Sequence, residues 1–249
     1  MYIPCNLERL KVVVQREQFH PGLLGIFVNP FYFARRGLYQ HIKSLSPSIY
    51  GKTLDIGCGG KPYKNICNSS EYIGLEIDSP ENRKNKEADY FYYGKKFPFQ
   101  DGEFDSVITS QVLEHIFNPD DFLSEANRVL KDGGILLISI PFVWDEHEQP
   151  YDYARYSSFG LKYLLENNGF NVIEYRKSIN DIRAIFQLIN GYIYKKTVTQ
   201  NAYLNLFITV ILMAPFNILG ELLYRILPKN DDLYLDSIVL AKKKGSKWA

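Results

Sequence analysis

The chain has 249 residues, of which 46% are hydrophobic and 23% are charged, an ordinary globular composition that allows one large domain or two small ones. Its 29 Lys and Arg residues against 28 Asp and Glu give a formal net charge of +1, so no basic surplus indicates a nucleic-acid partner. Three scattered cysteines and no uninterrupted apolar stretch near Met1 favour a reduced, cytoplasmic setting over a secreted one.

The first predicted element is a helix from Asn29 to about Leu45, because Asn29 suits an N-cap and Pro30 suits a first turn. Short apolar runs bounded by turn residues then predict strands at 53–56, 71–77, 89–93 and 104–109. The first of these strands runs directly into a cluster of glycines.

The clearest helix follows Asn118, with Pro119 in its first turn and Gly133-Gly134 as its stop signal. The apolar run 135–140 then predicts a strand that is buried on both faces. A helix at 157–168 and strands at 170–175 and 233–241 complete the pattern. Strands that alternate with helices predict a doubly wound α/β fold with a mainly parallel sheet.

Two features at strand ends indicate nucleoside binding. Gly57 and Gly59 form a tight turn after a buried strand, where a ligand can approach the backbone closely. Glu76 ends the next strand some twenty residues later, the place at which such sheets put an acid against ribose hydroxyls. Structural glycines and a plain strand-end acid are the alternative interpretation, but the combination favours a nucleoside site.

With these motifs, and three more in the expected order, the chain resembles the class I S-adenosylmethionine-dependent methyltransferases of the "type 11" group. The resemblance runs from about Asn29 to Tyr175 and includes the last strand. Its motifs are Leu54–Gly60, Gly74–Glu76, Phe97–Asp105, Ser110–His115 and Asn127–Gly134. It implies a Rossmann-like, seven-stranded mixed sheet and S-adenosyl-L-methionine as cofactor.

The resemblance also implies roles for single residues. Asp55, Gly57 and Gly59 would shape the pocket for the methionine part of the cofactor, and Glu76 would hold the ribose hydroxyls. The stretch from Ser110 to Leu113 would border the sulfonium. An acid near the end of the third strand usually contacts adenine in this family, and Asp89 is the nearest candidate.

The chain departs from the family pattern after the glycine turn. Lys61 stands where a glycine often ends the first motif, and only about a dozen residues separate the first two strands, so any helix between them must be very short. Pro62 also stands where the nicotinamide-dinucleotide fingerprint G-x-G-x-x-G requires glycine, which disfavours a dehydrogenase.

The loop 141–156 leaves the predicted carboxyl edge of the sheet and combines acids, aromatics, a histidine and an arginine. An oxygen acceptor must lose its proton during methyl transfer, and histidine is the commonest base near neutral pH. His147 is therefore the first candidate base, with Asp145 or Glu148 as its orienting partner. His115 is the second candidate. A salt-bridged surface loop is the alternative interpretation.

The same loop supplies the predicted acceptor site. Arg155 and Tyr156 suit an anionic or hydroxyl-rich acceptor, and Trp144 is assigned to the same site. No spacing of histidines and acids supports a metal, so none is predicted. The expected reaction is methyl transfer to a small-molecule or lipid-linked glycan acceptor, at oxygen. A non-catalytic cofactor-binding or partner-binding member of the fold is the alternative, and a dehydrogenase is a third.

About 55 residues separate the last two predicted strands, far more than a hairpin connection needs. The predicted organisation is a helical lead-in at 1–50, a methyltransferase domain at 51–177 and 232–242, and an apolar helical insertion at 178–231. The insertion carries an uncharged stretch, 197–220, with cations on both sides. A membrane surface, a second subunit in a homodimer and the domain's own core are its three possible partners.

Overall fold

The computed structural model describes residues 16–17, 19–85 and 87–245, and these form two compact units. The sheet unit comprises His41–Phe142, Glu146–Arg176 and the chain from Ser237 onward. The helical unit comprises the described residues up to Gln40, Val143–Asp145 and Lys177–Asp236.

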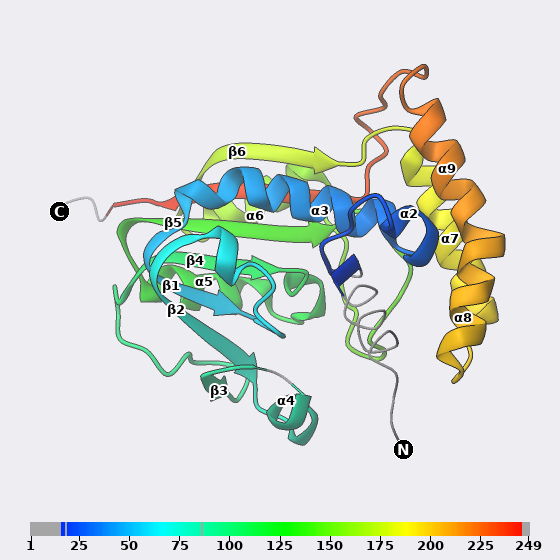
Figure 1. Cartoon of the computed structure of the whole chain (residues 1–249). Helices are drawn as coiled ribbons and strands as arrows, with labels where there is room; N and C mark the ends of the chain where they lie inside the picture. The colour runs from blue at the N-terminus through cyan, green and yellow to red at the C-terminus, as the bar shows by residue number, and fades with distance from the viewer. Residues whose placement is uncertain (1–15, 18, 86, 246–249) are drawn as a thin grey trace. The chain divides into compact units, whose positions relative to one another are not determined.

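One sheet organises the sheet unit, with its seven strands in the order β3-β2-β1-β4-β5-β7-β6. The strands are β1 (Tyr50–Ile56), β2 (Asn68–Ile77), β3 (Tyr90–Tyr92), β4 (Phe104–Ser110), β5 (Leu130–Pro141), β6 (Phe170–Ser178) and β7 (Asp236–Lys243). The first five strands pair in parallel, whereas β7, red in Figure 1, runs in the opposite direction. The predicted seven-stranded mixed sheet is confirmed.

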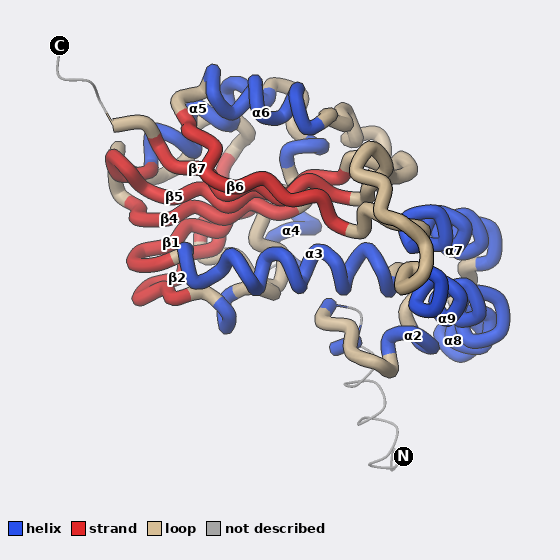
Figure 2. The backbone as a smooth tube through the Cα atoms, turned by 90° about the horizontal axis from the view of Figure 1, so that it is seen from above, coloured by secondary structure: helices blue, strands red, loops and turns tan. Residues whose placement is uncertain are grey.

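The helices of this unit are α4 (Pro80–Asn85), α5 (Pro119–Val129) and α6 (Ser158–Asn167), with the last turn of α3. Figure 2 shows α5 and α6 along one face of the sheet. Phe122, Leu123 and Ala126 of α5 and Leu161 and Leu165 of α6 belong to the same buried core as the sheet. Their helical spacing, visible in the sequence, is what directs these residues to one face.

The connection after β1 contains only a short 3-10 turn, Lys64–Ile66, as its length predicted. The end of α5, however, was predicted wrongly. The helix stops at Val129, and Leu130 already pairs with Phe104 of β4. Gly133-Gly134 therefore does not stop the helix. It lies in an irregularity of β5, where Gly133 has a φ of +73°.

The helical unit contains α2 (Gly25–Val28), most of α3 (Tyr32–Leu45), α7 (Arg183–Thr197), α8 (Ala202–Ile208) and α9 (Ala214–Leu223). A π-helical turn, Thr209–Met213, joins α8 to α9. Pro215, in the first turn of α9, lacks an N–H, and its ring would disturb a regular helix at this point. Figures 1 and 2 show α7 and α9 side by side. The predicted helical insertion before the last strand is confirmed.

Candidate functional site in the sheet unit

The glycine turn after β1 bends back onto the end of β2. Gly57 and Gly59 have φ angles of +71° and +52°, in the left-handed region that favours glycine. The Gly57 N–H bonds to the Leu75 carbonyl, and the Gly59 N–H donates to Glu76 Oε2 at 3.1 Å. Glu76 and the turn, both predicted to bind cofactor, are thus brought together.

The same turn leaves room for a ligand. A Cβ atom built on Gly59 or Gly60 would meet no heavy atom within 4 Å, whereas one on Gly57 would lie 2.3 Å from Val112 Cγ2. Gly57 therefore permits close packing against the segment after β4. Gly59 and Gly60 instead border open space at the carboxyl ends of β1 and β2, the position of ligand crevices in open α/β sheets.

Asp55 lies two residues before the turn and is buried, with 3% of its surface exposed. The Tyr72 hydroxyl donates to its Oδ2 at 2.8 Å. Burial raises the pKa of Asp55 to about 7 despite that hydrogen bond, and the nearby Glu76 carboxylate adds to the rise. A cationic group bound beside Asp55 would favour its charged form.

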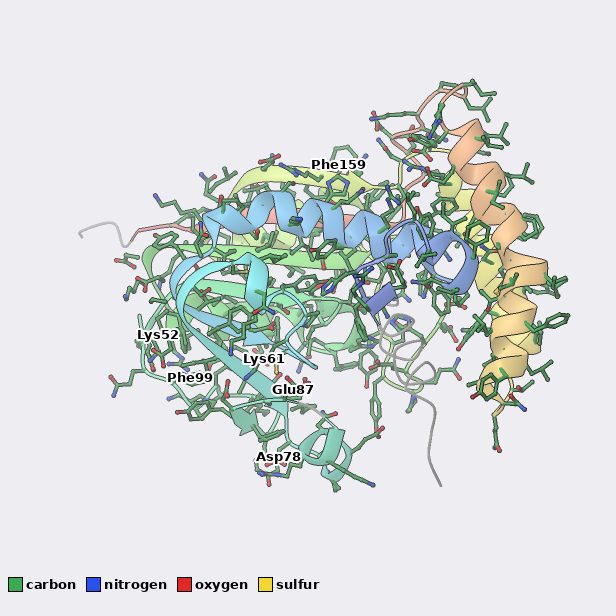
Figure 3. The ribbon with its side chains drawn as sticks, viewed as in Figure 1. Lys52, Lys61, Asp78, Glu87, Phe99 and Phe159 are labelled. Carbon is green, nitrogen blue, oxygen red and sulfur yellow. The ribbon has the colours of Figure 1, made fainter. Side chains whose placement is uncertain are left out.

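Lys61 and Asp89 form an ion pair beside the turn. Lys61 has a φ of +50°, which explains how it occupies a position where the family often has glycine. Its Nζ lies 2.7 Å from Asp89 Oδ2, and the Gly74 N–H donates to the same oxygen. Asp89 directly precedes β3, and its role toward adenine stays a prediction. Figure 3 labels Lys61 and Glu87. The backbone N–H of Glu87 donates to the Gly59 carbonyl of the same turn.

Ser110 ends β4, one residue beyond the pairing of Thr109 with Ile56 of β1. Its Oγ lies 2.8 Å from Ser139 Oγ on β5. This register places Ser110 at the same edge of the sheet as the glycine turn, where the resemblance puts the sulfonium.

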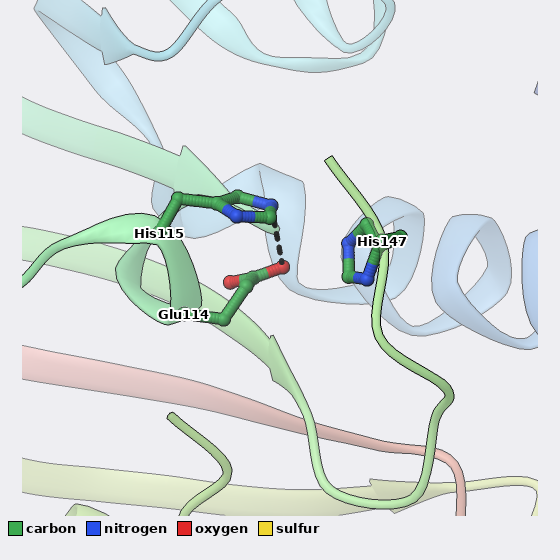
Figure 4. Close-up of side chains that lie close together, drawn as sticks. All are labelled: Glu114, His115 and His147. Carbon is green, nitrogen blue, oxygen red and sulfur yellow. Dashed lines mark ion pairs between the residues drawn. The ribbon is translucent and has the colours of Figure 1, made fainter. Parts of the chain in front are cut away.

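A second cluster, Glu114, His115 and His147, lies in the segments that follow β4 and β5 (Figure 4). The two imidazole rings meet edge to face with centroids 4.8 Å apart, and His115 Nε2 lies 3.8 Å from Glu114 Oε1. The Glu114 side chain is fully buried. The two candidate bases, far apart in the sequence, are thus neighbours.

Both imidazoles are oriented by acceptors on their Nδ1 atoms. His115 Nδ1 lies 2.8 Å from the Tyr151 carbonyl, which can only accept a hydrogen bond, so Nδ1 carries the proton. His147 Nδ1 lies 3.2 Å from Asp152 Oδ2, and the His147 N–H donates to the same oxygen. In the neutral form of each ring, Nε2 is then the atom free of hydrogen.

Asp152 is the member of this candidate site that the sequence did not reveal. Its carboxylate accepts two hydrogen bonds from Arg155, of 2.6 and 2.7 Å, and these hold its pKa down at about 2. Asp152 therefore stays charged and fixes both His147 and Arg155. The i, i+3 spacing of Asp152 and Arg155 was the only signal available.

The remaining predicted residues lie elsewhere. Trp144 and Asp145 belong to the helical unit, where Trp144 contacts Phe31 and Asp145 pairs with Lys195 Nζ at 2.8 Å. Tyr156 packs against the core of the sheet unit. Glu148, the other suggested partner of His147, lies 3.9 Å from His115 Nε2 instead.

The cluster also provides a donor set for a metal ion, although none was predicted. One ligand atom from each of Glu114, His115 and His147 lies within 4.8 Å of the others. Two imidazoles and a carboxylate are common ligands of transition metals, and each ring here has its second nitrogen held by an oxygen acceptor. A surface hollow of about 530 Å³ lies toward the amino ends of β3 and β4, lined by Tyr90, Phe99 and Glu103 among others, away from these residues.

Comparison with known proteins agrees with this arrangement. Residues 54–138 match the family model described as "Methyltransferase domain". A probable S-adenosylmethionine-dependent methyltransferase of Mycolicibacterium smegmatis is 34% identical over 83 residues, 31% of this chain and 32% of that protein. A ubiquinone biosynthesis O-methyltransferase of Caulobacter vibrioides is 30% identical over 98 residues, 34% of this chain and 39% of that protein. The chain thus spans about a third of the length of these two relatives.

Solved structures share the fold. The [4+2]-cyclase SpnF superposes with a TM-score of 0.54 at 18% identity, covering 84% of this chain and 82% of that one. Phosphoethanolamine N-methyltransferase 2 of Haemonchus contortus, in complex with S-adenosyl-L-methionine, gives 0.53 at 20% identity, covering 89% and 56%. These structures show the shared fold. The family model over residues 54–138 and the named methyltransferase relative, together with the glycine turn and Glu76, support a class I, S-adenosylmethionine-dependent methyltransferase domain in this chain.

Proposed function

We propose that this chain transfers a methyl group from S-adenosylmethionine to an oxygen atom of a small-molecule or lipid-linked glycan acceptor. The observation that carries this proposal is the pair His115 and His147, each with an oxygen acceptor beside Nδ1, which favours Nε2 as the basic nitrogen of the ring. The pair stands at the carboxyl edge of the same sheet that carries the glycine turn and Glu76.

Methyl transfer from a sulfonium is an in-line displacement, in which positioning supplies much of the rate. An oxygen acceptor must also lose a proton, and a neutral imidazole is suited to take it near pH 7. In this chain His147 Nε2 takes the acceptor proton, and Asp152 stabilises the resulting imidazolium through Nδ1. The named O-methyltransferase relatives support an oxygen acceptor.

The acceptor site that we propose is formed by the loop after β5. Arg155 directs a guanidinium at Asp152 and is held rigidly by it, and Tyr156 offers a hydroxyl. Such a combination of a cation and a hydroxyl suits an anionic or hydroxyl-rich molecule such as a glycan. Trp144, which the sequence assigned to the acceptor, belongs to the helical unit and is not part of this proposed site. We place the enzyme in the cytoplasm, at a membrane surface.

The test is transfer of label from methyl-labelled S-adenosylmethionine to a fractionated cell extract that includes the lipid fraction. Label should enter one fraction with the wild type and not with His147→Asn, and the product should be a methyl ether or ester. A His41→Asn variant is the matched control, because His41 lies in α3 outside the site. Product analysis that finds the methyl group on nitrogen or carbon would refute oxygen transfer.

A non-catalytic member of the fold is the alternative function. It predicts that S-adenosylhomocysteine binds while no label enters any fraction of the extract. A nicotinamide-dependent dehydrogenase predicts the reverse ligand preference, and Pro62 in place of the third fingerprint glycine argues against it.

A further inference from the structure

The helices of the helical unit bury their polar and small residues. On α7 the buried residues are Ala184, Gln187, Asn190 and Gly191. On the continuous helix Ala202–Leu223 the buried residues are Thr209, Met213, Ala214, Asn217 and Gly220. A helix on the surface of a protein in water normally does the opposite and buries its large apolar residues.

Hydrogen bonds between side chains and backbone join these helices. Asn190 Nδ2 donates to Asn217 Oδ1 at 2.9 Å, and Asn217 Nδ2 donates to the Ile26 carbonyl at 2.8 Å. Gln187 accepts from the Phe33 N–H and donates to the Pro30 carbonyl. The helices of this unit are thus linked through buried amides.

Small residues bring the same helices close together. A Cβ atom on Gly220 would lie 2.5 Å from Phe33 Cζ, so only glycine permits this contact. Small residues at the contact and polar side chains bonded across it are the packing pattern of helices in lipid, where apolar surface gains nothing by turning inward.

The outer face of Ala202–Leu223 is correspondingly apolar. Large apolar side chains that are 39% to 62% exposed recur along this face every three or four residues: Leu204, Phe207, Ile211, Ile218 and Leu222. Pro215 occupies the one position of this spacing between Ile211 and Ile218. By length and composition this is the one helix among the described residues that suffices to cross a membrane, and 28% of its apolar window is buried. Leu23, Leu24 and Phe27, around the adjoining α2, are also exposed. An exposed apolar surface this large marks an interaction site.

Cations stand at both ends of this surface. Lys196 lies in the last turn of α7, and Arg225 and Lys229 follow α9; all three are exposed. No acid lies on the outer face between them, since Glu221 is turned toward Arg183 at 3.8 Å. The charge pattern is complementary to anionic lipid headgroups that surround an apolar interior.

We propose that the outer face of Ala202–Leu223, together with the exposed residues around α2, embeds in one leaflet of a lipid bilayer that contains anionic lipid. Lys196, Arg225 and Lys229 then contact headgroups. The partner helix α7 has 15 residues, and at about 1.5 Å per residue it is about 22 Å long, too short for a hydrocarbon core of about 30 Å. Insertion into one leaflet therefore fits α7 and Ala202–Leu223 better than a pair of helices that spans the bilayer. This inference does not depend on the reaction catalysed.

The test is co-sedimentation of the full chain with vesicles of phosphatidylcholine and phosphatidylglycerol. The double variant Phe207→Asp/Ile211→Asp should bind at least about a hundredfold more weakly, because carboxylates in the acyl region are costly. Phe159→Asp is the matched control and should bind like the wild type, because Phe159, labelled in Figure 3, lies on the sheet unit and is 85% exposed. Vesicles of phosphatidylcholine alone should bind the wild type more weakly than the mixed vesicles do.

Circular dichroism establishes that each variant is folded, independently of any cofactor. Equal vesicle binding by the wild type and by the folded double variant would overturn the proposal. A second outcome would also overturn the proposal: the wild type does not bind vesicles but forms a dimer in sedimentation equilibrium, and the double variant is a monomer. That result would assign the face to a second copy of the chain.

Discussion

The buried carboxyl group of Asp55 makes the stability of the cofactor-free protein depend on pH. Burial raises its pKa to about 7 in the folded chain, from the value of 3.8 for an ordinary aspartate. Between these two values the folded state holds a proton that the unfolded state releases, so this group's contribution to stability falls as the pH rises from about 4 to about 7. This difference in pKa between the unfolded and folded chain corresponds to up to about 4 kcal/mol of unfolding free energy.

Asp55→Asn removes this titration, because the amide stays neutral at all pH values. We expect the difference in unfolding free energy between the variant and the wild type to shift in favour of the variant as the pH rises from about 4.5 to about 7.5. Urea unfolding at several pH values without cofactor measures it. Asp121→Asn, at an exposed site on α5, is the control. A pH-independent difference for Asp55→Asn would show that Asp55 is ionised throughout.

Glu76 is predicted to bind the ribose of the cofactor, and its contact with the Gly59 N–H at 3.1 Å holds it beside the open space of the turn. Glu76→Ala should weaken S-adenosylhomocysteine binding at least about tenfold, since a charge-assisted hydrogen bond contributes about 1.5–3 kcal/mol. Calorimetry measures the affinity. Glu71→Ala, on the same strand but 58% exposed, should leave it unchanged. An unaltered affinity for Glu76→Ala would remove Glu76 from the site.

The orientation of His147 predicts a particular dependence of rate on pH. Asp152, with a pKa of about 2, stays anionic at all useful pH values and does not titrate in the profile. Any rise of the wild-type rate with pH should therefore come from the catalytic base and not from Asp152. His147→Asn should abolish this rise and most of the activity. If the profile survives that substitution, His115 becomes the base to test next.

Among the elements, the glycine turn after β1 contains one glycine that is needed for packing, Gly57, and one that faces the proposed ligand site, Gly59. Gly57→Ala should cost about 2 kcal/mol of stability or more, because its Cβ would meet Val112 at 2.3 Å and its φ is +71°. Gly59→Ala should cost about 1 kcal/mol through its φ alone, yet weaken S-adenosylhomocysteine binding strongly, since its methyl group enters open space.

Gly102→Ala provides the matched control for this pair. Gly102 also has a positive φ, +62°, but lies in the turn before β4, at the amino edge of the sheet. The variant should lose stability to the extent that Gly59→Ala does and keep full cofactor affinity. Denaturant unfolding and calorimetry on the three variants give the comparison. Equal affinities for Gly59→Ala and Gly102→Ala would place the cofactor elsewhere.

How far the sequence predicts these elements depends on whether their signals are local. The strands around the turn and the helix α5 follow from apolar spacing and from Pro119, and the structure confirms them. The end of α5 does not follow, because Leu130 leaves the helix to pair with Phe104, a contact made through the sheet. Asp152 could not be assigned to the site from the sequence for the same reason. Its contact with His147 depends on how the loop folds back, which no local pattern records.

At the scale of the whole molecule, the apolar stretch 197–220 was visible in the sequence, but its orientation was not. Hydrophobicity alone does not tell which face of a helix is buried. The structure shows Asn217 and Thr209 turned inward and Phe207 and Ile211 turned outward. This reversal, rather than the number of apolar residues, is what favours lipid over a protein core as the partner of the helix.

We expect the sheet unit to bind the cofactor and the helical unit to bind membrane, and a deletion can test this division. The core cluster that α5 and α6 form with the sheet draws its members from Leu54–Phe170 and from β7, and this cluster includes no residue between 178 and 231. The glycine turn, Glu76 and the histidine pair all belong to that unit. Deleting 197–220 should therefore leave S-adenosylhomocysteine binding measurable in calorimetry while vesicle co-sedimentation is lost. The full-length chain and the folded Phe207→Asp/Ile211→Asp variant are the controls. If the deletion abolishes cofactor binding together with cooperative unfolding, the sheet unit needs these helices to fold, and their apolar residues serve the protein's own stability.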